Sequence, residues 1–293
     1  MIRDDLALVH REVLDWYAEH HRDLPWRAPD AGAWAVLVSE VMLQQTPVVR
    51  VLPAYDAWMH RWPTPSALAA DAPGDAVRMW GRLGYPRRAL RLHAAATTIE
   101  VEHDGELPTT YAELRSLPGV GDYTANAILA FANHRRAVVL DTNVRRVHAR
   151  LFGGVEFPAV AVTAAERRLG EEVLPGDDET AATWSVAVME LGALVCQARS
   201  PRCTACPVAD RCQWLGEGFP AYDGPPRKGQ TYAGTDRQVR GRILAVLRDT
   251  DDAIDPAAVT TVWDDAVQRD RALASLLDDG LVVLRSDGLL ALP

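Results

Sequence analysis

Four cysteines lie close together and have a spacing that could hold a metal. They form the pattern C-x6-C-x2-C-x5-C at Cys196, Cys203, Cys206 and Cys212, and the chain has no other cysteine. Four thiolates suit a structural zinc ion and equally suit a [4Fe–4S] cluster. Zinc ribbons usually supply two short C-x2-C pairs, whereas this pattern has one. The spacing therefore predicts a metal and favours iron–sulfur only slightly over zinc.

One carboxylate lies inside an apolar helix. Glu40 is the ionisable residue of the stretch AVLVSEVML. Burial on that helix would raise the pKa of Glu40 and prepare it as a general acid. The alternative is that Glu40 lies at the edge of the apolar face and reaches an arginine. The polar residues Gln44 and Gln45 follow, and such side chains can read base edges.

A second carboxylate and a glycine-rich turn occur further along the chain. Asp141 follows the apolar stretch VVL and could cap a helix that begins at Thr142. The turn Leu117-Pro118-Gly119-Val120-Gly121 lies between two expected helices. It is either an ordinary helix connection or a turn whose backbone N–H groups bind phosphate at a helix N-terminus.

The net charge is −9, which by itself argues against a nucleic-acid binder. The charge is unevenly spread, because residues 249–293 hold ten Asp, no Glu and three Arg and so carry −7. Thirty of the 31 basic residues are arginine, and Lys228 is the single lysine. Arginine runs at 78–93, 135–150 and 227–248 favour an anionic partner.

These candidate residues must be positioned by helices, since apolar residues recur at helical spacing along most of the chain. The first helix contains the stripe Leu6 to Tyr17. The others are expected at Trp34–Leu43, Tyr55–Arg61, Asp75–Leu83, Arg88–Glu102, Tyr111–Leu117, Tyr123–Asn133, Thr142–Leu151, Thr163–Val173 and Ala181–Val195.

The end of the chain has a different organisation. Residues 217–234 are rich in Gly, Pro and Asp and are expected to form a linker. Three short helices at Arg237–Arg248, Asp255–Trp263 and Gln268–Leu277, followed by two strands around a Ser-Asp-Gly turn, predict a winged-helix-like module over 235–293.

Taken together, six stretches resemble the helix-hairpin-helix DNA glycosylases, and more narrowly the adenine DNA glycosylases of the MutY type. They occur in the family's order over about residues 10–215: LPWR (24–27), SEVMLQQT (39–46), RLGY (82–85), LPGVGDYTANAIL (117–129), LDTNVRRV (140–147) and the segment from Glu190 to Cys212. The resemblance implies a mainly α glycosylase domain over 1–216. Its six-helix part would span about 28–137, with the remaining helices and an iron–sulfur loop in 1–27 and 138–216.

The resemblance also implies roles for single residues. Glu40 would protonate the leaving purine and Asp141 would stabilise the sugar cation, with Asn143 and Tyr123 orienting Asp141 and the sugar. The DNA contacts would come from Arg27, Gln44, Gln45, Tyr85, Gly119 and Gly121. Of these, Gln45 and Tyr85 would wedge into the space that the flipped nucleotide leaves and lie next to the mispaired base. The four cysteines would hold a [4Fe–4S] cluster. The expected substrate is double-stranded DNA in which adenine pairs with 8-oxoguanine or guanine.

The lysine count bears on the type of reaction. In glycosylases of the endonuclease III type, a lysine at the start of the helix after the hairpin cuts the backbone through a Schiff base. Tyr123 stands at that position, and Lys228 lies in the expected linker. We therefore expect a monofunctional glycosylase without lysine-dependent lyase activity.

Three departures from the family pattern leave alternatives open. Pro86 follows the RLGY tyrosine where a second Tyr is common, and Val186 stands where many members have Gln or Glu. The usual Nudix-like C-terminal domain is missing or replaced. The alternatives are a uracil or thymine mismatch glycosylase, an iron–sulfur DNA-binding protein without catalysis, and a zinc-dependent regulator.

The remaining expectations concern location and partners. The charged N-terminus lacks the apolar stretch of a signal peptide, and no apolar run is long enough for a spanning helix, so we expect a cytoplasmic protein without membrane contact. We expect a monomer whose acidic C-terminal module docks on protein, either on its own body or on a repair partner.

Overall fold

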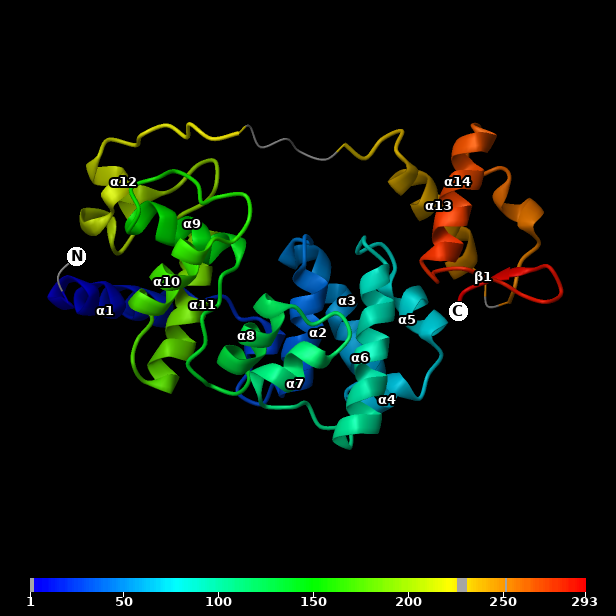
Figure 1. Cartoon of the computed structure of the whole chain (residues 1–293), viewed down its shortest axis with the longest axis horizontal. Helices are drawn as coiled ribbons and strands as arrows, with labels where there is room; N and C mark the ends of the chain where they lie inside the picture. The colour runs from blue at the N-terminus through cyan, green and yellow to red at the C-terminus, as the bar shows by residue number, and fades with distance from the viewer. Residues whose placement is uncertain (1–2, 226–230, 251) are drawn as a thin grey trace. The chain divides into compact units, whose positions relative to one another are not determined.

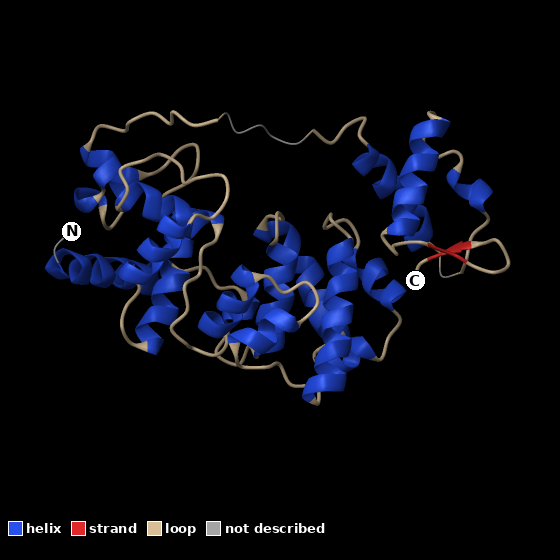
Figure 2. Ribbon diagram, viewed as in Figure 1, coloured by secondary structure: helices blue, strands red, loops and turns tan. Residues whose placement is uncertain are grey.

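The computed structural model describes residues 3–225, 231–250 and 252–293. The regular secondary structure of the described chain is almost entirely helical (Figures 1 and 2), as the spacing predicts. It forms two compact units. The first consists of Met1–Val36, Thr109–Arg115 and Val120–Pro226, and the second of Leu37–Pro108, Ser116–Gly119 and Arg227–Pro293.

The first unit is built around three packed helices: α1 (Arg3–His20), α9 (Thr142–Leu151) and α11 (Asp178–Leu194). Their apolar faces share one core that includes Val13, Val147 and Trp184. Around it lie the 3-10 helices η1 (Pro25–Arg27), η2 (Cys203–Ala205) and η3 (Ala209–Arg211), and the helices α8 (Asp122–Phe131), α10 (Ala164–Val173) and α12 (Gln213–Gly216). Helix α7 (Tyr111–Ser116) leads into the glycine-rich turn.

The second unit begins with α2 (Ala33–Leu43), whose first four residues belong to the first unit, and continues through α3 (Val48–Arg61), α4 (Pro65–Ala69), α5 (Pro73–Trp80) and α6 (Arg87–His103). Trp80 and Trp62 each pack edge-on against Trp58, and all three side chains are fully buried. Helix α6 packs against both α4 and α5. These contacts fix the turn at 81–86, which joins α5 to α6.

Several helices differ from the sequence prediction, among them two of the second unit. Helix α3 begins at Val48, seven residues earlier than expected, and contains Pro53. It persists through this proline because Val51, Tyr55 and Trp58 are buried on one face. Helix α4 was not predicted. Thr64 caps it by accepting a hydrogen bond from the Ala67 amide, a typical N-cap contact.

The C-terminal module consists of α13 (Asp236–Arg248), the 3-10 helix η4 (Pro256–Val259), α14 (Ala266–Asp278) and the antiparallel strands β1 (Val283–Leu284) and β2 (Leu290–Ala291). A bridge between Ile254 and Leu290 extends the ribbon. The expected helix over 255–263 is wrong in length, because its Asp255 cap and Pro256 start only a 3-10 turn. The order of elements otherwise follows the predicted winged-helix-like pattern. Part of the expected linker, with Lys228, lies outside the described residues.

No helix in the part of the chain that the structure describes is both long enough and apolar enough to span a membrane.

Candidate active site

Asp141 both caps a helix and presents a carboxylate held by two donors. Its Oδ1 accepts a hydrogen bond of 2.6 Å from the amide of Val144, the N-cap contact of α9. Its Oδ2 accepts a bond of 2.8 Å from the Asn143 amide group. Burial raises the pKa of Asp141, and these two donors together with Arg146 oppose the rise because they favour the ionised form. Asn143 thus contacts the carboxylate that the resemblance expects it to orient, and that role stays a prediction.

A chain of hydrogen bonds continues from Asn143 to the cysteine loop. The Arg146 guanidinium donates to Asn143 Oδ1 at 2.8 Å, to the carbonyl of Gly192 at 2.6 Å and to the carbonyl of Cys196 at 2.7 Å. A Cβ at Gly192 would lie 2.7 Å from the Asn143 Cβ, so only glycine lets α11 approach α9 here. The first cysteine is therefore connected to Asp141 through two side chains.

The glycine-rich turn depends on one of its two glycines more than on the other. Gly119 has a φ of 81°, and a Cβ there would lie 2.8 Å from the Arg91 Cβ. Gly121 caps α8 with φ −90° and has no atom within 4 Å of an added Cβ. The open side of Gly121 leaves room at the start of α8, where free N–H groups favour a phosphate.

Tyr123 follows in the first turn of α8 and is half-buried. It packs against a small apolar cluster that contains Ala127 and Val139. An aromatic side chain rather than an amine therefore stands at the start of the helix after the hairpin.

Glu40 is buried in α2, with 6% of its side chain exposed. Its neighbours Ser39 and Val41 are buried as well. This buried position agrees with the first of the two placements that the sequence left open, inside the apolar face, and the role of the carboxyl stays a prediction. A carboxyl group withdrawn from water in this way is suited to donate a proton.

The expected DNA-contact residues Gln45 and Tyr85 lie on two turns with left-handed backbone, at φ 56° and 47°. Gln45 is exposed, whereas Gln44 and Tyr85 are half-buried. Left-handed non-glycine residues are uncommon and persist where surrounding contacts hold them.

Arg88 joins these two turns. Its guanidinium is buried and donates to the carbonyl of Gln44 at 2.6 Å, to that of Gly84 at 3.0 Å and to Thr46 Oγ1 at 3.0 Å. It also bonds the last carbonyls of α2. One planar group with several donors thus fixes both turns, which suits arginine better than lysine.

The four cysteines lie in one segment of the first unit. Burial raises the thiol pKa of Cys206 to about 12, and the charges of the other three cysteines add to the rise. The described residues contain no group of three or more His, Cys, Asp or Glu side chains that would hold one metal ion. Four cysteine thiolates are the donor set that a [4Fe–4S] cluster takes, so the residues present fit that group.

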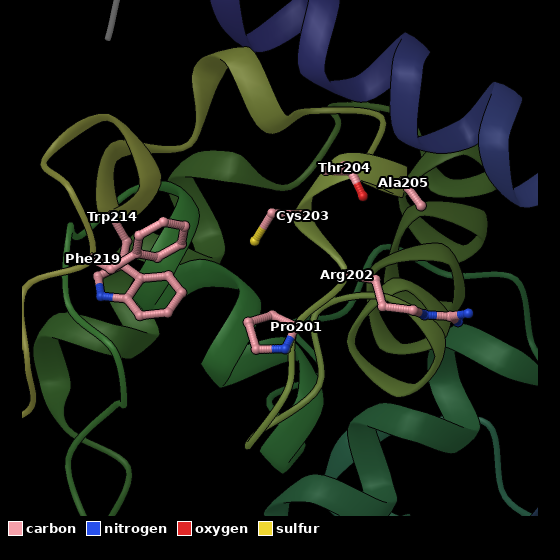
Figure 3. Close-up of a pocket in the computed structure, with 7 residues that line it drawn as sticks. All are labelled: Pro201, Arg202, Cys203, Thr204, Ala205, Trp214 and Phe219. Atoms are coloured by element: carbon pink, nitrogen blue, oxygen red, sulfur yellow. The ribbon is translucent and has the colours of Figure 1, made fainter.

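Arg150 organises the loop around these cysteines. It is buried, lies 4.5 Å from the centre of the Trp214 ring, and donates to Cys196 Sγ at 3.4 Å and to the Gln197 carbonyl at 2.8 Å. An open pocket of about 560 Å³ adjoins the loop (Figure 3) and is lined by Pro201, Arg202, Cys203, Thr204, Ala205, Trp214 and Phe219.

Several arginines expected to face an anionic partner are used inside the protein. The side chains of Arg88, Arg145, Arg146 and Arg150 are buried. Arg145 pairs with Glu166 at 2.8 Å, and the other three bond mainly carbonyls. The arginine runs in the sequence therefore contain more cations than the surface exposes, because a buried guanidinium can donate to several carbonyls at once.

Arg27, which the sequence places among the DNA contacts, lies in a buried ion pair. Its Nη2 donates to Glu190 Oε2 at 2.9 Å, and Arg22 binds both oxygens of the same carboxylate at 2.7 Å. Burial would raise the pKa of Glu190, but the two arginines overcome this effect and lower it to about 2. This contact ties η1 to α11, a role that no pattern in the sequence indicated.

Comparisons with known proteins agree with these features. The family profile described as "HhH-GPD superfamily base excision DNA repair protein" matches residues 38–171. A second profile, "Iron-sulfur binding domain of endonuclease III", matches residues 196–212, the segment with the four cysteines.

Among curated proteins, an adenine DNA glycosylase of Mycobacterium tuberculosis is 52% identical over 282 residues, which cover 96% of this chain and 92% of the relative. An adenine DNA glycosylase of Mycolicibacterium smegmatis is also 52% identical and is covered over 94% of its length. Among solved structures, a thermostable thymine-DNA glycosylase superposes with a TM-score of 0.67 at 24% identity over 73% of this chain and 98% of the other. At that identity the likeness shows the fold alone.

Proposed function

The chain belongs to the adenine DNA glycosylases, within the helix-hairpin-helix superfamily of base excision repair proteins, and from this membership we propose that it hydrolyses the N-glycosidic bond of adenine paired with 8-oxoguanine or guanine in duplex DNA. The observation that carries the proposal is the 52% identity to adenine DNA glycosylases over nearly the whole length of both chains. A thymine-DNA glycosylase of Aeropyrum pernix is 31% identical over 71% of this chain. Adenine is the proposed base because the identity to the adenine DNA glycosylases is higher and covers 96% of the chain.

Glu40 supplies the proton in this mechanism. The target nucleotide leaves the base stack, since its glycosidic bond is unreachable inside the duplex. The Glu40 carboxyl donates a proton to N7 of the adenine. The C1′–N9 bond then breaks, its electron pair stays with the base, and adenine leaves as a neutral molecule. The buried position of Glu40 in α2 supports this role.

Asp141 acts on the sugar that remains. Loss of the base leaves an oxocarbenium-like C1′, and the Asp141 carboxylate stabilises it by charge or by a transient covalent bond before water adds. The bonds from Val144 and Asn143 hold that carboxylate in place. The four cysteines would hold a [4Fe–4S] cluster, which fixes the loop that follows α11.

We further propose that the reaction stops at base removal. Tyr123 stands where an endonuclease III-type enzyme would use its lysine, and a phenol cannot form a Schiff base. Incubation with a cleavable duplex and borohydride should trap no covalent complex. A trapped complex would show that some other amine, such as Lys228 or the N-terminus, performs the lyase step.

The proposed partner is a duplex with a mismatched or oxidised base pair, bound by a monomer. We also propose a protein partner for the acidic C-terminal module. One face of the module packs against other residues of the second unit. Arg78 Nη1 donates to the carbonyl of Arg248 at 2.9 Å, and Arg248 Nε donates to that of Val77 at 3.0 Å.

A duplex panel tests the proposal. Single-turnover release should be fastest from A:8-oxoguanine and A:G, and slow or absent from T:G and U:G. Glu40→Gln should lower adenine release by about 10²- to 10⁴-fold, the usual contribution of a general acid, with duplex affinity nearly unchanged. Faster release of uracil or thymine than of adenine would favour a pyrimidine mismatch glycosylase instead. Duplex binding without release of any base would indicate a DNA-binding protein without catalysis.

A further inference from the structure

The C-terminal module packs within the second unit through α13. At the C-terminal end of this helix, Arg78 Nη1 donates to the carbonyls of Leu247 and Arg248, and Arg248 donates in return to Val77. Close by, the end of the chain lies on α5, where a Cβ at Gly74 would come within 2.4 Å of the Pro293 carbonyl oxygen. Helix α13 is thus held against α5 at one end.

The other end of α13 lies at Tyr85. Arg237 is the second residue of the helix, and its guanidinium carbon is 4.4 Å from the centre of the Tyr85 ring. The guanidinium of Arg240, one turn further on, pairs with Asp279, which also pairs with Arg87 of α6 at 3.2 Å. Because α13 is held at both ends, the position of Arg237 relative to Tyr85 is fixed by packing.

Tyr85 is the residue expected beside the mispaired base, and its surroundings are unusual. Its backbone is left-handed, and the Arg88 guanidinium lies 5.7 Å from its ring. Arg88 fixes the backbone on either side of the turn, whereas Arg237 lies against the ring itself. A guanidinium this close to a ring is attracted by the negative face of the π-system.

The arginines of α14 are engaged in ion pairs within the module. On α14, the helix that would read DNA in a winged helix, Arg271 pairs with Asp236 at 2.7 Å and Arg269 with Asp270 at 3.3 Å. These ion pairs leave α14 a poor match for a phosphate backbone. The cation of the module that lies against an expected DNA-contact residue is Arg237.

We propose that Arg237 is a positioning residue that holds the Tyr85 ring for its contact with the mispaired base, so that the C-terminal module takes part in reading the substrate. This inference rests on the proposed function, since it assigns the module a part in adenine recognition. Loss of the contact removes the nearer of the two guanidinium groups beside the Tyr85 ring, so the ring adopts other rotamers more readily, and ordering it again on DNA costs binding or rate. One exposed cation–π contact corresponds to about a two- to fivefold effect.

A double-mutant cycle of Arg237→Ala and Tyr85→Leu tests the inference. Single-turnover adenine release is measured from A:8-oxoguanine and A:G duplexes. Affinity is measured with a 2′-fluoro-deoxyadenosine duplex, which resists cleavage because fluorine destabilises the sugar cation. Arg237→Ala should lower release or affinity two- to fivefold in the wild-type background and change neither in the Tyr85→Leu background. Arg237→Lys, which keeps a cation near the ring, should recover part of the loss.

Arg242→Ala is the matched control. Arg242 is exposed on the same helix and lies 4.9 Å from the Trp263 ring within the module, so its loss removes a similar contact away from Tyr85. It should leave release and affinity at the wild-type level. Thermal unfolding of every variant checks that the fold is intact.

Two outcomes would overturn the inference: equal losses in both backgrounds, or no loss from Arg237→Ala. The salt dependence of affinity separates positioning from direct phosphate binding. Positioning leaves the slope of log Kd against log salt unchanged, whereas a lost phosphate contact reduces it by about one. If the wild-type protein releases no adenine, the proposed function fails. The double-mutant cycle can still be measured on duplex affinity, and it then decides whether Arg237 acts through Tyr85.

Discussion

Asp141 illustrates how one side chain serves both the fold and the chemistry. From the sequence, helix capping alone accounts for an aspartate before Thr142. In the structure Oδ1 makes that cap, and Oδ2 is held by Asn143, which is held in turn by Arg146. Capping engages one oxygen and leaves the other to be positioned, so the two roles coexist.

The two roles separate in Asp141→Asn. Asparagine caps a helix about as well as aspartate, so the free energy of unfolding should change by less than about 1 kcal/mol. Adenine release should fall by about a thousandfold or more, because the neutral amide cannot stabilise the sugar cation. Urea denaturation and single-turnover release measure the two effects.

Asp177→Asn is the control for this substitution. Asp177 caps α11 in the same manner, through a 2.9 Å bond from the Thr180 amide. Both release and stability should stay near the wild-type values. Normal release by Asp141→Asn would remove Asp141 from the mechanism.

At the scale of elements, the sequence predicted most helices but not how they are joined. Apolar spacing identified α9 and α11, whereas α4 was missed, since a helix of five residues is too short to show a period. The hairpin between α7 and α8 was recognised from its glycines, but the sequence did not distinguish their roles. Gly119 needs a left-handed backbone beside Arg91, and Gly121 does not.

Alanine substitutions should separate the two glycines. Gly119→Ala should destabilise the fold by about 1–3 kcal/mol, because it places a Cβ on a left-handed backbone and against the Arg91 side chain. Gly121→Ala should leave stability near the wild-type value. Chemical denaturation measures both changes.

Duplex affinity adds information on phosphate binding by this turn. If a phosphate approaches the backbone at Gly121, Gly121→Ala should weaken binding without loss of stability. Equal stability of the two variants would contradict the role of the left-handed turn.

At the scale of the whole molecule, the acidic tail is a part of the second unit rather than an appendage. The sequence predicts docking on protein from the charge of −7 over 249–293. The observed contacts are made by arginines with carbonyls, by one ion pair from Arg87 to Asp279, and by the chain end at Gly74. These contacts are mostly hydrogen bonds to carbonyls, so the acidic charge of the module did not indicate this surface, and a protein partner for the module stays a prediction.

Gly74→Ala tests this packing. The added Cβ would meet the backbone at Pro293, so the chain end must move away from α5. We expect a lower melting temperature and faster proteolysis of the C-terminal module. Gly176→Ala, where a Cβ meets nothing within 4 Å, should behave as the wild-type protein does. Unchanged proteolysis of Gly74→Ala would indicate that the end of the chain does not anchor the module.

The sequence by itself determined the helical class, the order of the motifs and the residues that could do chemistry, because helical periodicity, capping and cysteine spacing are local properties of the chain. Only the tertiary structure decided which arginines are available to a ligand. Arg88 and Arg146 look like surface cations in the sequence, yet each bonds groups from segments distant along the chain. A guanidinium has the same charge in either setting, so its role depends on the carbonyl and carboxylate groups that folding brings within reach.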